Sequence, residues 1–201
     1  MRIIGGTLRG RHLTAPAGRD TRPTSDRVRG SVFDILTHRF FSGGSWEGLR
    51  VADVFAGTGA MGFEALSRGA SHATFLDNRS EALRTIRANA EALNLRDRVS
   101  VVGGDALTPP RMREPFSLIF LDPPYALGVA SAALVALAGA GWLGPDTLCA
   151  VELEAKNTLA PPEGWIIADE RSHGRTKMVF IEKLEIRGAL PELGAARMNS
   201  E

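Results

Sequence analysis

Cysteine is almost missing from this 201-residue sequence, which contains Cys149 alone. One thiol cannot form a disulfide within the chain, and its apolar surroundings favour a buried side chain. The four histidines are scattered without the spacing of metal ligands, so we predict no metal site. A run of about 18 apolar residues is also lacking, which argues against a transmembrane helix. With no apolar signal-peptide core near the N-terminus, we expect a soluble cytoplasmic protein without a membrane partner.

Lysine is scarce too, and the basic charge is distributed unevenly. The net charge is +1, but residues 1–40 carry +5, whereas the rest of the chain carries −4. This clustering of arginine favours an anionic partner for the N-terminal segment, although a merely solvated face would have the same composition. The length fits one ordinary domain with a small appendage, and we expect a monomer.

Strands and helices are expected to alternate from Leu49 onward. Hydrophobic periodicity predicts strands over 50–55, 73–77, 99–103, 117–121, 148–153, 165–171 and 177–183. It predicts helices over 60–68, 80–93 and 128–139, the second with Ser80 as its N-cap. Ahead of them, residues 2–14 are expected to form a hairpin turning at Gly5-Gly6, and a helix is expected to start near Thr24 or Ser25.

This alternation predicts an α/β protein with a mainly parallel seven-stranded sheet and helices on both faces, a Rossmann-like architecture. The last two strands leave no room for a helix between them, so the sheet should end antiparallel. We divide the chain into a basic hairpin and helix extension at 1–45, a main domain at 46–184, and a flexible tail at 185–201.

The segment 51–62 reads as a short strand, a glycine-rich turn and the start of a helix. Its three glycines match the dinucleotide-binding fingerprint, and Asp77 follows where a ribose-binding acid should lie. The motif alone fits either a nicotinamide dinucleotide or S-adenosylmethionine, because both carry an adenosine. Asp53, ahead of the glycines, would repel a pyrophosphate but could hold a cationic amino group; the alternative is that it only caps the turn.

A second motif, Asp122-Pro123-Pro124-Tyr125, directly follows the apolar run 116–121. The carboxylate of Asp122 can accept a hydrogen bond from an amine, Pro123 offers a carbonyl, and the Tyr125 ring can cover a planar group. Together they suit the exocyclic amine of a stacked base. The simpler interpretation is a rigid turn between a strand and a loop.

Four acids, Asp53, Asp77, Asp105 and Asp122, follow successive predicted strands. The carboxyl ends of parallel strands meet at one edge of a sheet, where ligands bind at the topological switch point. We therefore expect these acids to converge on one site, although any single one of them could be a solvated loop residue or a cap.

Over residues 2–183 the chain resembles S-adenosylmethionine-dependent methyltransferases with a Rossmann-like sheet. More specifically, it resembles the bacterial 16S rRNA guanine-N2 methyltransferase family, also called small-subunit methyltransferase D. The motifs that carry the resemblance are Arg2-Ile3-Ile4-Gly5-Gly6, Arg9-Gly10-Arg11, Arg22-Pro23-Thr24-Ser25-Asp26-Arg27-Val28-Arg29, Asp53-Val54-Phe55-Ala56-Gly57-Thr58-Gly59 and Asp122-Pro123-Pro124-Tyr125. Gly30 and Asp34 depart from the family's pattern, which has an acidic residue and Asn there.

The resemblance implies methyl transfer from S-adenosyl-L-methionine to the N2 amine of one guanine in 16S rRNA (the guanine-966 type), within the small ribosomal subunit or an assembly intermediate. It implies that Asp77 binds the ribose, that Asp105 binds the adenine amine, and that Arg22 and Thr24 close over the cofactor. The implied cofactor-binding residues are Arg22, Thr24, Asp53, Phe55, Ala56, Gly57, Thr58, Gly59, Asp77, Asn78, Asp105 and Ala106. The implied catalytic residues are Asp122, Pro123 and Tyr125, and the implied RNA-binding residues are Arg2, Arg9, Arg11 and Arg27.

Four other functions remain open from the residues. An adenine-N6 methyltransferase would use residues 122–125 in the same way, but the sequence shows no separate target-recognition domain. A glutamine-N5 methyltransferase would more typically present Asn at position 122. A nicotinamide oxidoreductase explains the glycines and leaves residues 122–125 unused. A non-catalytic rRNA-binding factor explains the basic N-terminus and leaves the acids at the strand ends unused.

Overall fold

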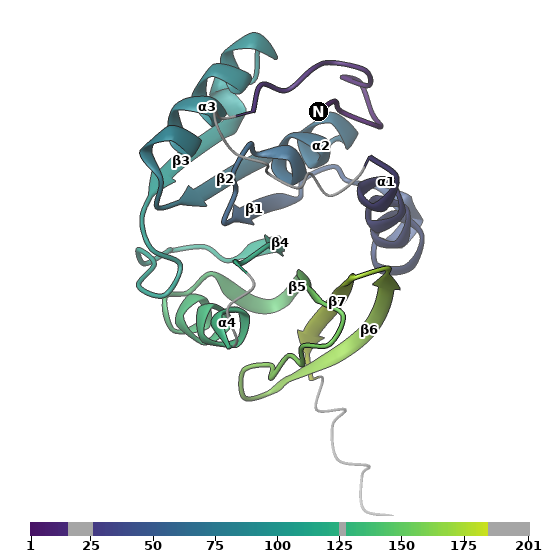
Figure 1. Cartoon of the computed structure of the whole chain (residues 1–201), viewed down its shortest axis with the longest axis vertical. Helices are drawn as coiled ribbons and strands as arrows, with labels where there is room; N and C mark the ends of the chain where they lie inside the picture. Colours follow the sequence, from purple (N-terminus) through teal and green to yellow (C-terminus); the bar gives the residue numbers. More distant parts are fainter. Residues whose placement is uncertain (16–25, 125–127, 185–201) are drawn as a thin grey trace, which may run out of the picture.

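The computed structural model describes residues 1–15, 26–124 and 128–184, and within them seven strands form one sheet. The strand order is β3-β2-β1-β4-β5-β7-β6 (Figure 1). The strands are β1 (Arg50–Val54), β2 (His72–Asp77), β3 (Val99–Gly103), β4 (Phe116–Leu121), β5 (Leu143–Glu154), β6 (Trp165–His173) and β7 (Thr176–Lys183). The first five strands pair in parallel, and β7 pairs antiparallel with both β5 and β6, as the sequence predicts.

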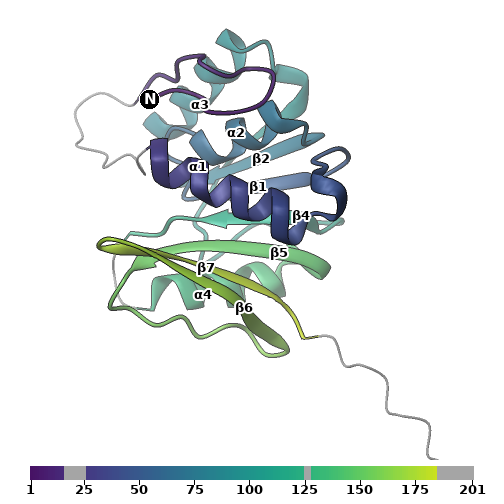
Figure 2. The ribbon, with the colours of Figure 1, turned by 90° about the vertical axis from the view of Figure 1, so that its right-hand side faces the viewer.

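The helices lie on both faces of the sheet (Figures 1 and 2). They are α1 (Asp26–Ile35), α2 (Ala60–Arg68), α3 (Ser80–Ala92) and α4 (Val129–Gly139), with a π-helical turn at Leu36–Phe40 and 3₁₀ turns at Ser42–Gly44 and Arg96–Arg98. Within these described residues, no helix has both the length and the apolar character needed to cross a bilayer.

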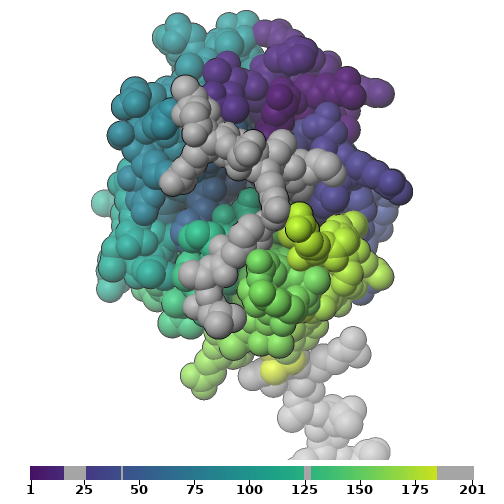
Figure 3. Space-filling view, in the orientation of Figure 1, coloured from purple at the N-terminus to yellow at the C-terminus, as the bar shows by residue number. Residues whose placement is uncertain are grey.

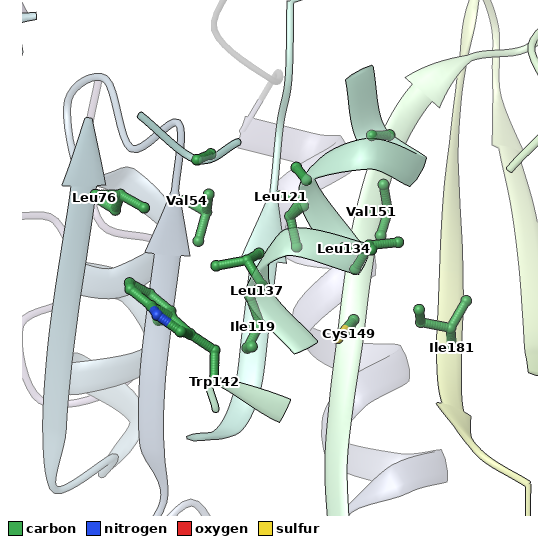
Figure 4. Close-up of a cluster of buried hydrophobic side chains, with 14 of the residues drawn as sticks. Val54, Leu76, Ile119, Leu121, Leu134, Leu137, Trp142, Cys149, Val151 and Ile181 are labelled. Carbon is green, nitrogen blue, oxygen red and sulfur yellow. The ribbon is translucent and has the colours of Figure 1, made fainter. Parts of the chain in front are cut away.

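The alternation of side chains along each strand assigns the two faces. In β4, Leu118 and Phe120 are buried with the residues of α1, whereas Ile119 and Leu121 are buried with those of α4. Figure 4 shows the α4 face, where side chains from β1, β2, β4, β5 and β7 meet Leu134 and Leu137 of the helix. A third buried cluster joins α2 and α3 to the N-terminal residues. Each strand therefore sends alternate residues into separate cores, which fixes the direction of the residue that follows it.

Most predicted elements are confirmed within a few residues. The largest difference is β5, which begins at Leu143 instead of 148 because its first residues pair with the start of β4 before a bulge. The N-cap of α3 is Arg79, not Ser80, and no side-chain hydrogen bond caps that helix. Arg79 makes other contacts, which are described below.

The N-terminal segment forms the predicted hairpin, because residues 1–3 pair antiparallel with residues 10–13 through backbone hydrogen bonds, but its turn spans residues 7–10. Arg2 and His12 form one antiparallel bridge, and the chain between them does not turn tightly at Gly5-Gly6. Instead, the backbone N–H groups of Ile4 and Gly5 donate to the buried carboxylate of Glu64 on α2, at 2.7 and 2.8 Å. The segment consequently packs against α2 and α3 and does not extend from the molecule (Figures 2 and 3). The expected start of α1 near Thr24 or Ser25 lies outside the described residues.

Candidate functional site

The turn after β1 has a left-handed backbone at three positions. Phe55, Gly57 and Gly59 have φ values of 62°, 58° and 79°. A Cβ at Gly59 would lie 2.7 Å from the Phe63 ring, and a Cβ at Gly62 would lie 2.4 Å from the Phe75 ring. Those two glycines therefore serve internal packing. Gly57 differs, because the nearest atom to a Cβ there is an arginine nitrogen at 3.7 Å. Of these three glycines, Gly57 is the one whose backbone a ligand could approach closely.

Asp53 lies at the end of β1 beneath this turn and is only 4% exposed. Its carboxylate accepts a hydrogen bond of 2.9 Å from the backbone N–H of Gly62 at the start of α2. Burial raises the pKa of Asp53 to about 8, and the charges of Asp122 and Asp77 act in the same direction. Asp53 thus holds the turn against the helix, as the capping alternative predicts, and a cation placed beside it would favour its ionised form.

Asp77 ends β2 with its side chain almost fully buried. One carboxylate oxygen accepts the backbone N–H of Gly57 at 2.9 Å and Nη2 of Arg79 at 3.1 Å. The other accepts the backbone N–H and Nε of Arg79, at 2.9 and 3.1 Å. Burial alone would raise the pKa of Asp77, but the hydrogen bonds from Arg79 and Gly57 hold it below its ordinary value. Asp77 is therefore an anion at neutral pH whose four lone-pair sites are all occupied.

The loop after β3 places Asp105 and Ala106 at the same edge of the sheet. Asp105 is exposed, and one of its oxygens accepts the backbone N–H of Leu107 at 2.9 Å, which fixes the loop locally. Ala106 is buried against the α4 face. Leu107 is 41% exposed, unusual for a large apolar side chain. A carboxylate beside an exposed apolar surface could accept from an amino group on a planar ring.

Asp122 and Pro123 follow β4 at this edge, next to the end of β1. The backbone N–H of Asp122 is 3.4 Å from the carbonyl oxygen of Val54. Asp122 is open to solvent, whereas Pro123 is buried. Although Asp122 keeps solvent access, the protein packed around its carboxylate, followed by the charge of Glu152, raises its pKa above the ordinary value. The structure therefore presents an accessible carboxylate with an acceptor-only backbone beside it, a combination that suits an amine.

The remaining predicted residues of the turn have supporting contacts. Thr58 is buried; its hydroxyl lies 3.6 Å from the sulfur of Met1, and its carbonyl accepts from Asn89. Ala56 is also buried, Phe55 packs against the α4 face, and Asn78 is exposed next to Asp77. Arg22, Thr24 and Tyr125 lie outside the described residues.

The predicted RNA-binding arginines are all exposed on the N-terminal segment and α1. Arg2 pairs with Asp26 at 3.1 Å, and Arg11 donates to the carbonyl of Ala92 at the end of α3, at 2.6 Å. Arg9 and Arg27 have their side chains in solvent. Arg2, Arg9 and Arg11 lie on the N-terminal segment that Glu64 anchors, and Arg27 lies on α1, so none of them follows one of the strands that carry the acids.

Sequence reasoning missed three charged residues near this site. Arg79 directly precedes the helix predicted over 80–93, and Glu64 lies within the helix predicted over 60–68, but neither position by itself indicates a partner. Glu152 lies in β5 within the run Leu148–Leu153, which otherwise reads as a buried strand, yet it carries the charge that acts on Asp122. Only the period-two alternation could have indicated that Glu152 shares a face with Leu148 and Ala150. Among the residues that the structure describes, no group of three acidic, histidine or cysteine side chains could hold a metal ion.

The arrangement suits an adenosyl cofactor. Asp77 is an ionised carboxylate on which a ribose diol could replace the two hydrogen bonds from the Arg79 side chain. Gly57 leaves the backbone accessible, and Asp53 is a buried acid that a cation would ionise. S-adenosylmethionine carries such a cation, whereas a pyrophosphate would meet two buried acids.

Comparison with known proteins gives a consistent result. The family described as conserved hypothetical protein 95 matches residues 1–182. Ribosomal RNA small subunit methyltransferase D of Haemophilus influenzae is 34% identical over 181 residues, which is 87% of this chain and 89% of that protein. The Escherichia coli protein of the same name is 35% identical over 180 residues, or 87% and 86% of the two chains.

Solved structures agree with these sequence matches. The structure of yhhF from Escherichia coli superposes with a TM-score of 0.76 at 31% identity, covering 91% of this chain and 97% of the other. The sheet order, the helices on both faces and these neighbours identify a Rossmann-like methyltransferase fold. The chain therefore belongs to the conserved hypothetical protein 95 family, the family of ribosomal RNA small subunit methyltransferase D.

Proposed function

We propose that this protein is an S-adenosylmethionine-dependent methyltransferase that methylates the N2 amine of one guanine in 16S rRNA, of the guanine-966 type. The observation that carries the proposal is the set of acids at one edge of the sheet. Asp77 and Asp53 lie at the ends of β2 and β1, and Asp122 lies at the end of the adjacent β4. Relatives named as ribosomal RNA methyltransferases are similar in sequence to this chain over most of its length, and this similarity supports an RNA substrate.

The cofactor would be held by residues of β1, β2 and the loop after β3. Asp77 would accept the ribose hydroxyls, Asp53 and the backbone around Gly57 would hold the amino-acid part, and Asp105 would accept from the adenine amine. When bound, S-adenosylmethionine would supply a methyl group whose bond to sulfur breaks as its bond to the amine nitrogen forms. The segment that contains Arg22 and Thr24 is assigned to closing over this site.

Asp122 and Pro123 would prepare the amine. The lone pair of the guanine N2 is delocalised into the ring, so the amine is a poor nucleophile. If the Asp122 carboxylate and the Pro123 carbonyl each accept one N–H, the nitrogen can become pyramidal and direct its lone pair at the methyl carbon. The proton leaves after the transfer, and a carboxylate with a raised pKa can accept it. Tyr125 is assigned to stacking on the base, which typically contributes about 1–3 kcal/mol.

The N-terminal part, residues 1–45, would hold the RNA while the domain at 46–184 carries out the reaction. The exposed Arg2, Arg9 and Arg11 on the anchored N-terminal arm, and the exposed Arg27 on α1, would contact phosphates. Phosphate contacts position a protein without reading the sequence, so base selection is assigned to the acidic edge. The protein would act in the cytoplasm as a monomer. Its partner would be the small ribosomal subunit or an assembly intermediate of that subunit.

The experiment is a transfer assay with labelled S-adenosylmethionine and four substrates: free 16S rRNA, assembled small subunits, partly assembled particles and DNA. We expect label in the RNA of one or more ribosomal substrates and none in DNA. The Asp122→Ala protein, with cofactor binding measured alongside, is the matched negative control. Transfer to DNA alone, or none to any nucleic acid while NAD binds tightly, would overturn the proposal.

A further inference from the structure

A groove of about 620 Å³ lies between α1 and strand β6. Figures 1 and 2 show α1 and the β6–β7 hairpin side by side. Arg27 lines the groove from the first turn of α1, Arg39 from the π-helical turn that follows the helix, and Arg171 from β6. Three arginines from separate elements thus face one groove, and the proposed function does not use Arg39 or Arg171.

Arg39 and Arg171 share a single carboxylate, that of Asp169 on β6. The oxygen Oδ2 of Asp169 lies 3.1 Å from Nη1 of Arg39 and 2.9 Å from Nη2 of Arg171. The side chain of Asp169 is 10% exposed, whereas the two arginine side chains are 48% and 47% exposed. One negative charge cannot neutralise two guanidinium ions, which stay charged in proteins. These three side chains therefore leave one surplus positive charge at the wall of the groove.

The two guanidinium groups are held in place and still keep donors for a ligand. Nη2 of Arg39 also donates to the carbonyl oxygen of Ala168 at 3.3 Å, so this side chain is tied to β6 at two points. A guanidinium has five N–H groups, and the contacts to Asp169 and Ala168 occupy only some of them. Phosphate oxygens accept short, strong hydrogen bonds from such groups. The pair is thus a preorganised anion site, and a phosphodiester matches it in charge and in geometry.

Two acids also line the groove, but each of them already has an arginine nearby. Asp26 accepts from Nε of Arg2 at 3.1 Å and from Nη2 of Arg29 at 3.0 Å. Asp34 lies 4.0 Å from Nη1 of Arg68. These arginines are additional to the three that line the groove, so the groove and its surroundings keep a net positive charge.

The strand register places the arginine pair on the substrate side of the site. β6 lies three strands away from β4, which at about 4.8 Å per strand is roughly 14 Å. Through the pairing of β6 with β7, of β7 with β5 and of β5 with β4, Asp169 is level with Phe120, two residues before Asp122. The pair therefore lies on the order of 15 Å from Asp122, on the side away from β1 and β2. An RNA strand whose target base is held at Asp122 can reach it within a few nucleotides, and the acids at the strand ends repel phosphates toward it.

We propose that this groove binds the phosphodiester backbone of the RNA next to the target guanine, with Arg39 and Arg171 as the pair that holds a phosphate. The inference rests on the proposed function for the identity of the nucleic acid, and it adds a second RNA-binding surface to that of the N-terminal arginines. Phosphate contacts fix the position of a nucleic acid and do not read its bases. The groove would therefore determine which nucleotide reaches Asp122 by holding the neighbours of that nucleotide.

Arg171→Ala tests the surplus charge directly. It leaves Arg39 and Asp169 as a one-to-one pair, so the buried acid keeps a partner. Filter binding with 16S rRNA, without cofactor and at several salt concentrations, measures the affinity and its salt dependence. We expect weaker binding and a slope of log affinity against log salt that is reduced by about 0.7–0.9, the value for one phosphate contact. The matched control is Arg96→Ala, because Arg96 is an exposed arginine that pairs with Glu91 ahead of β3, at the other end of the sheet. This control should keep the parental slope.

Asp169→Asn should change RNA binding in the opposite direction. Removing the acid releases both guanidinium groups and raises the surplus from one positive charge to two, so this variant should bind 16S rRNA more tightly than the parent does. If the three side chains only stabilise the fold, this variant gains no affinity. Thermal melts of all variants check that they fold, and if Asp169→Asn does not fold, the result for Arg171→Ala decides.

The outcomes separate this inference from the proposed function. If Arg171→Ala keeps the parental affinity and slope while the unaltered protein methylates rRNA, the groove does not bind RNA and only this inference is wrong. If the salt dependence of rRNA binding changes in Arg171→Ala but the unaltered protein transfers no methyl group, the inference holds and the proposed function fails. If the unaltered protein binds no rRNA, both are wrong.

Discussion

The two halves of the acidic edge differ in how their carboxylates are satisfied. At the ends of β1 and β2, Asp53 and Asp77 accept hydrogen bonds from backbone and arginine, and their positions are fixed before any ligand arrives. At the end of β4, Asp122 is exposed, and the surrounding protein and then the charge of Glu152 on the adjacent β5 raise its pKa. The first half is fixed by contacts within the protein and, under the proposed function, holds the cofactor, whereas the second half takes the substrate amine. The predictions below separate the halves, in order of decreasing effect.

The largest effect is expected from Asp122→Ala. Removing one preorganised electrostatic group usually lowers a rate by about 10²–10³, because the group acts mainly in the transition state. Affinity for S-adenosylmethionine should stay nearly unchanged, since the residue belongs to the substrate half. Single-turnover methylation and calorimetry check the two parts separately. Near-normal turnover in this variant would show that the amine is prepared elsewhere.

The reverse pattern is expected from Asp77→Ala. A hydrogen bond to a charged group contributes about 1.5–3 kcal/mol, so S-adenosylmethionine should bind about 10-fold to 100-fold more weakly. Binding of RNA in the absence of cofactor should not change. Calorimetry with S-adenosylhomocysteine and filter binding with RNA measure both quantities. If Asp77→Ala weakens the binding of S-adenosylhomocysteine and of RNA equally, the two halves of the acidic edge are not independent.

The N-terminal arginines test whether RNA is held outside both halves. In Arg9→Ala/Arg11→Ala, each lost phosphate contact should remove about 0.7–0.9 from the slope of log affinity against log salt. Cofactor binding should be unaffected, and a thermal melt checks the loss of the Arg11 contact to Ala92. The matched control, Arg111→Ala/Arg113→Ala, changes two exposed arginines in the loop before β4. A parental slope in the first variant would mean that its arginines are only solvated.

Asp53 gives a pH-dependent prediction about stability. Its folded pKa of about 8 lies above the unfolded value, so the folded state binds the extra proton between roughly pH 4 and 8. This contribution is present at low pH and is lost as the pH rises toward 8. Asp53→Asn, which keeps the acceptor for Gly62, should therefore become more stabilising relative to the parent between pH 5 and 8.5. One pKa unit is about 1.4 kcal/mol, or about 3–6 °C for a chain of this length.

Thermal melts at the two pH values measure this difference. Asp146→Asn, at an exposed position before the buried part of β5, is the control and should show no such trend. If Asp53→Asn changes the melting temperature equally at both values, then Asp53 is ionised in the folded protein and the preorganised half does not store a proton.

The smallest effect is expected from Arg79→Ala. Two of the four donors to Asp77 come from the Arg79 side chain, so its removal leaves one acceptor site on each oxygen for a diol. S-adenosylhomocysteine should bind a few-fold more tightly, because it no longer has to displace the guanidinium. Arg84→Ala, an exposed arginine on α3, controls for the lost charge. Weaker binding in Arg79→Ala would indicate that the arginine contacts the ligand instead.

Much of the preorganised half could be predicted from the sequence, because local patterns define it. A short apolar strand, three glycines and an acid after the next strand determine the turn, the β-α unit and the place of Asp77. The pairing of Arg79 with Asp77 could not be predicted, since a residue at a helix start has many possible orientations. Asp122 could be identified as a candidate site residue because two prolines follow it directly after an apolar run.

The substrate half depends on contacts between distant segments. Glu152 becomes informative only when the strand order places β5 next to β4 and the alternation assigns its face. Glu64 is a similar case, because its role appears only when residues about 60 positions earlier dock on it. The sequence carries both residues, but long-range topology decides what they contact.

The central claim is that the acidic edge methylates a guanine amine in ribosomal RNA. Its most direct test is mass spectrometry of nucleosides from 16S rRNA that has been incubated, free or in small subunits, with the protein and S-adenosylmethionine. The account predicts N2-methylguanosine at a single position, absent with the Asp122→Ala protein. N6-methyladenosine in its place, or no methylated nucleoside from any ribosomal substrate, would contradict it.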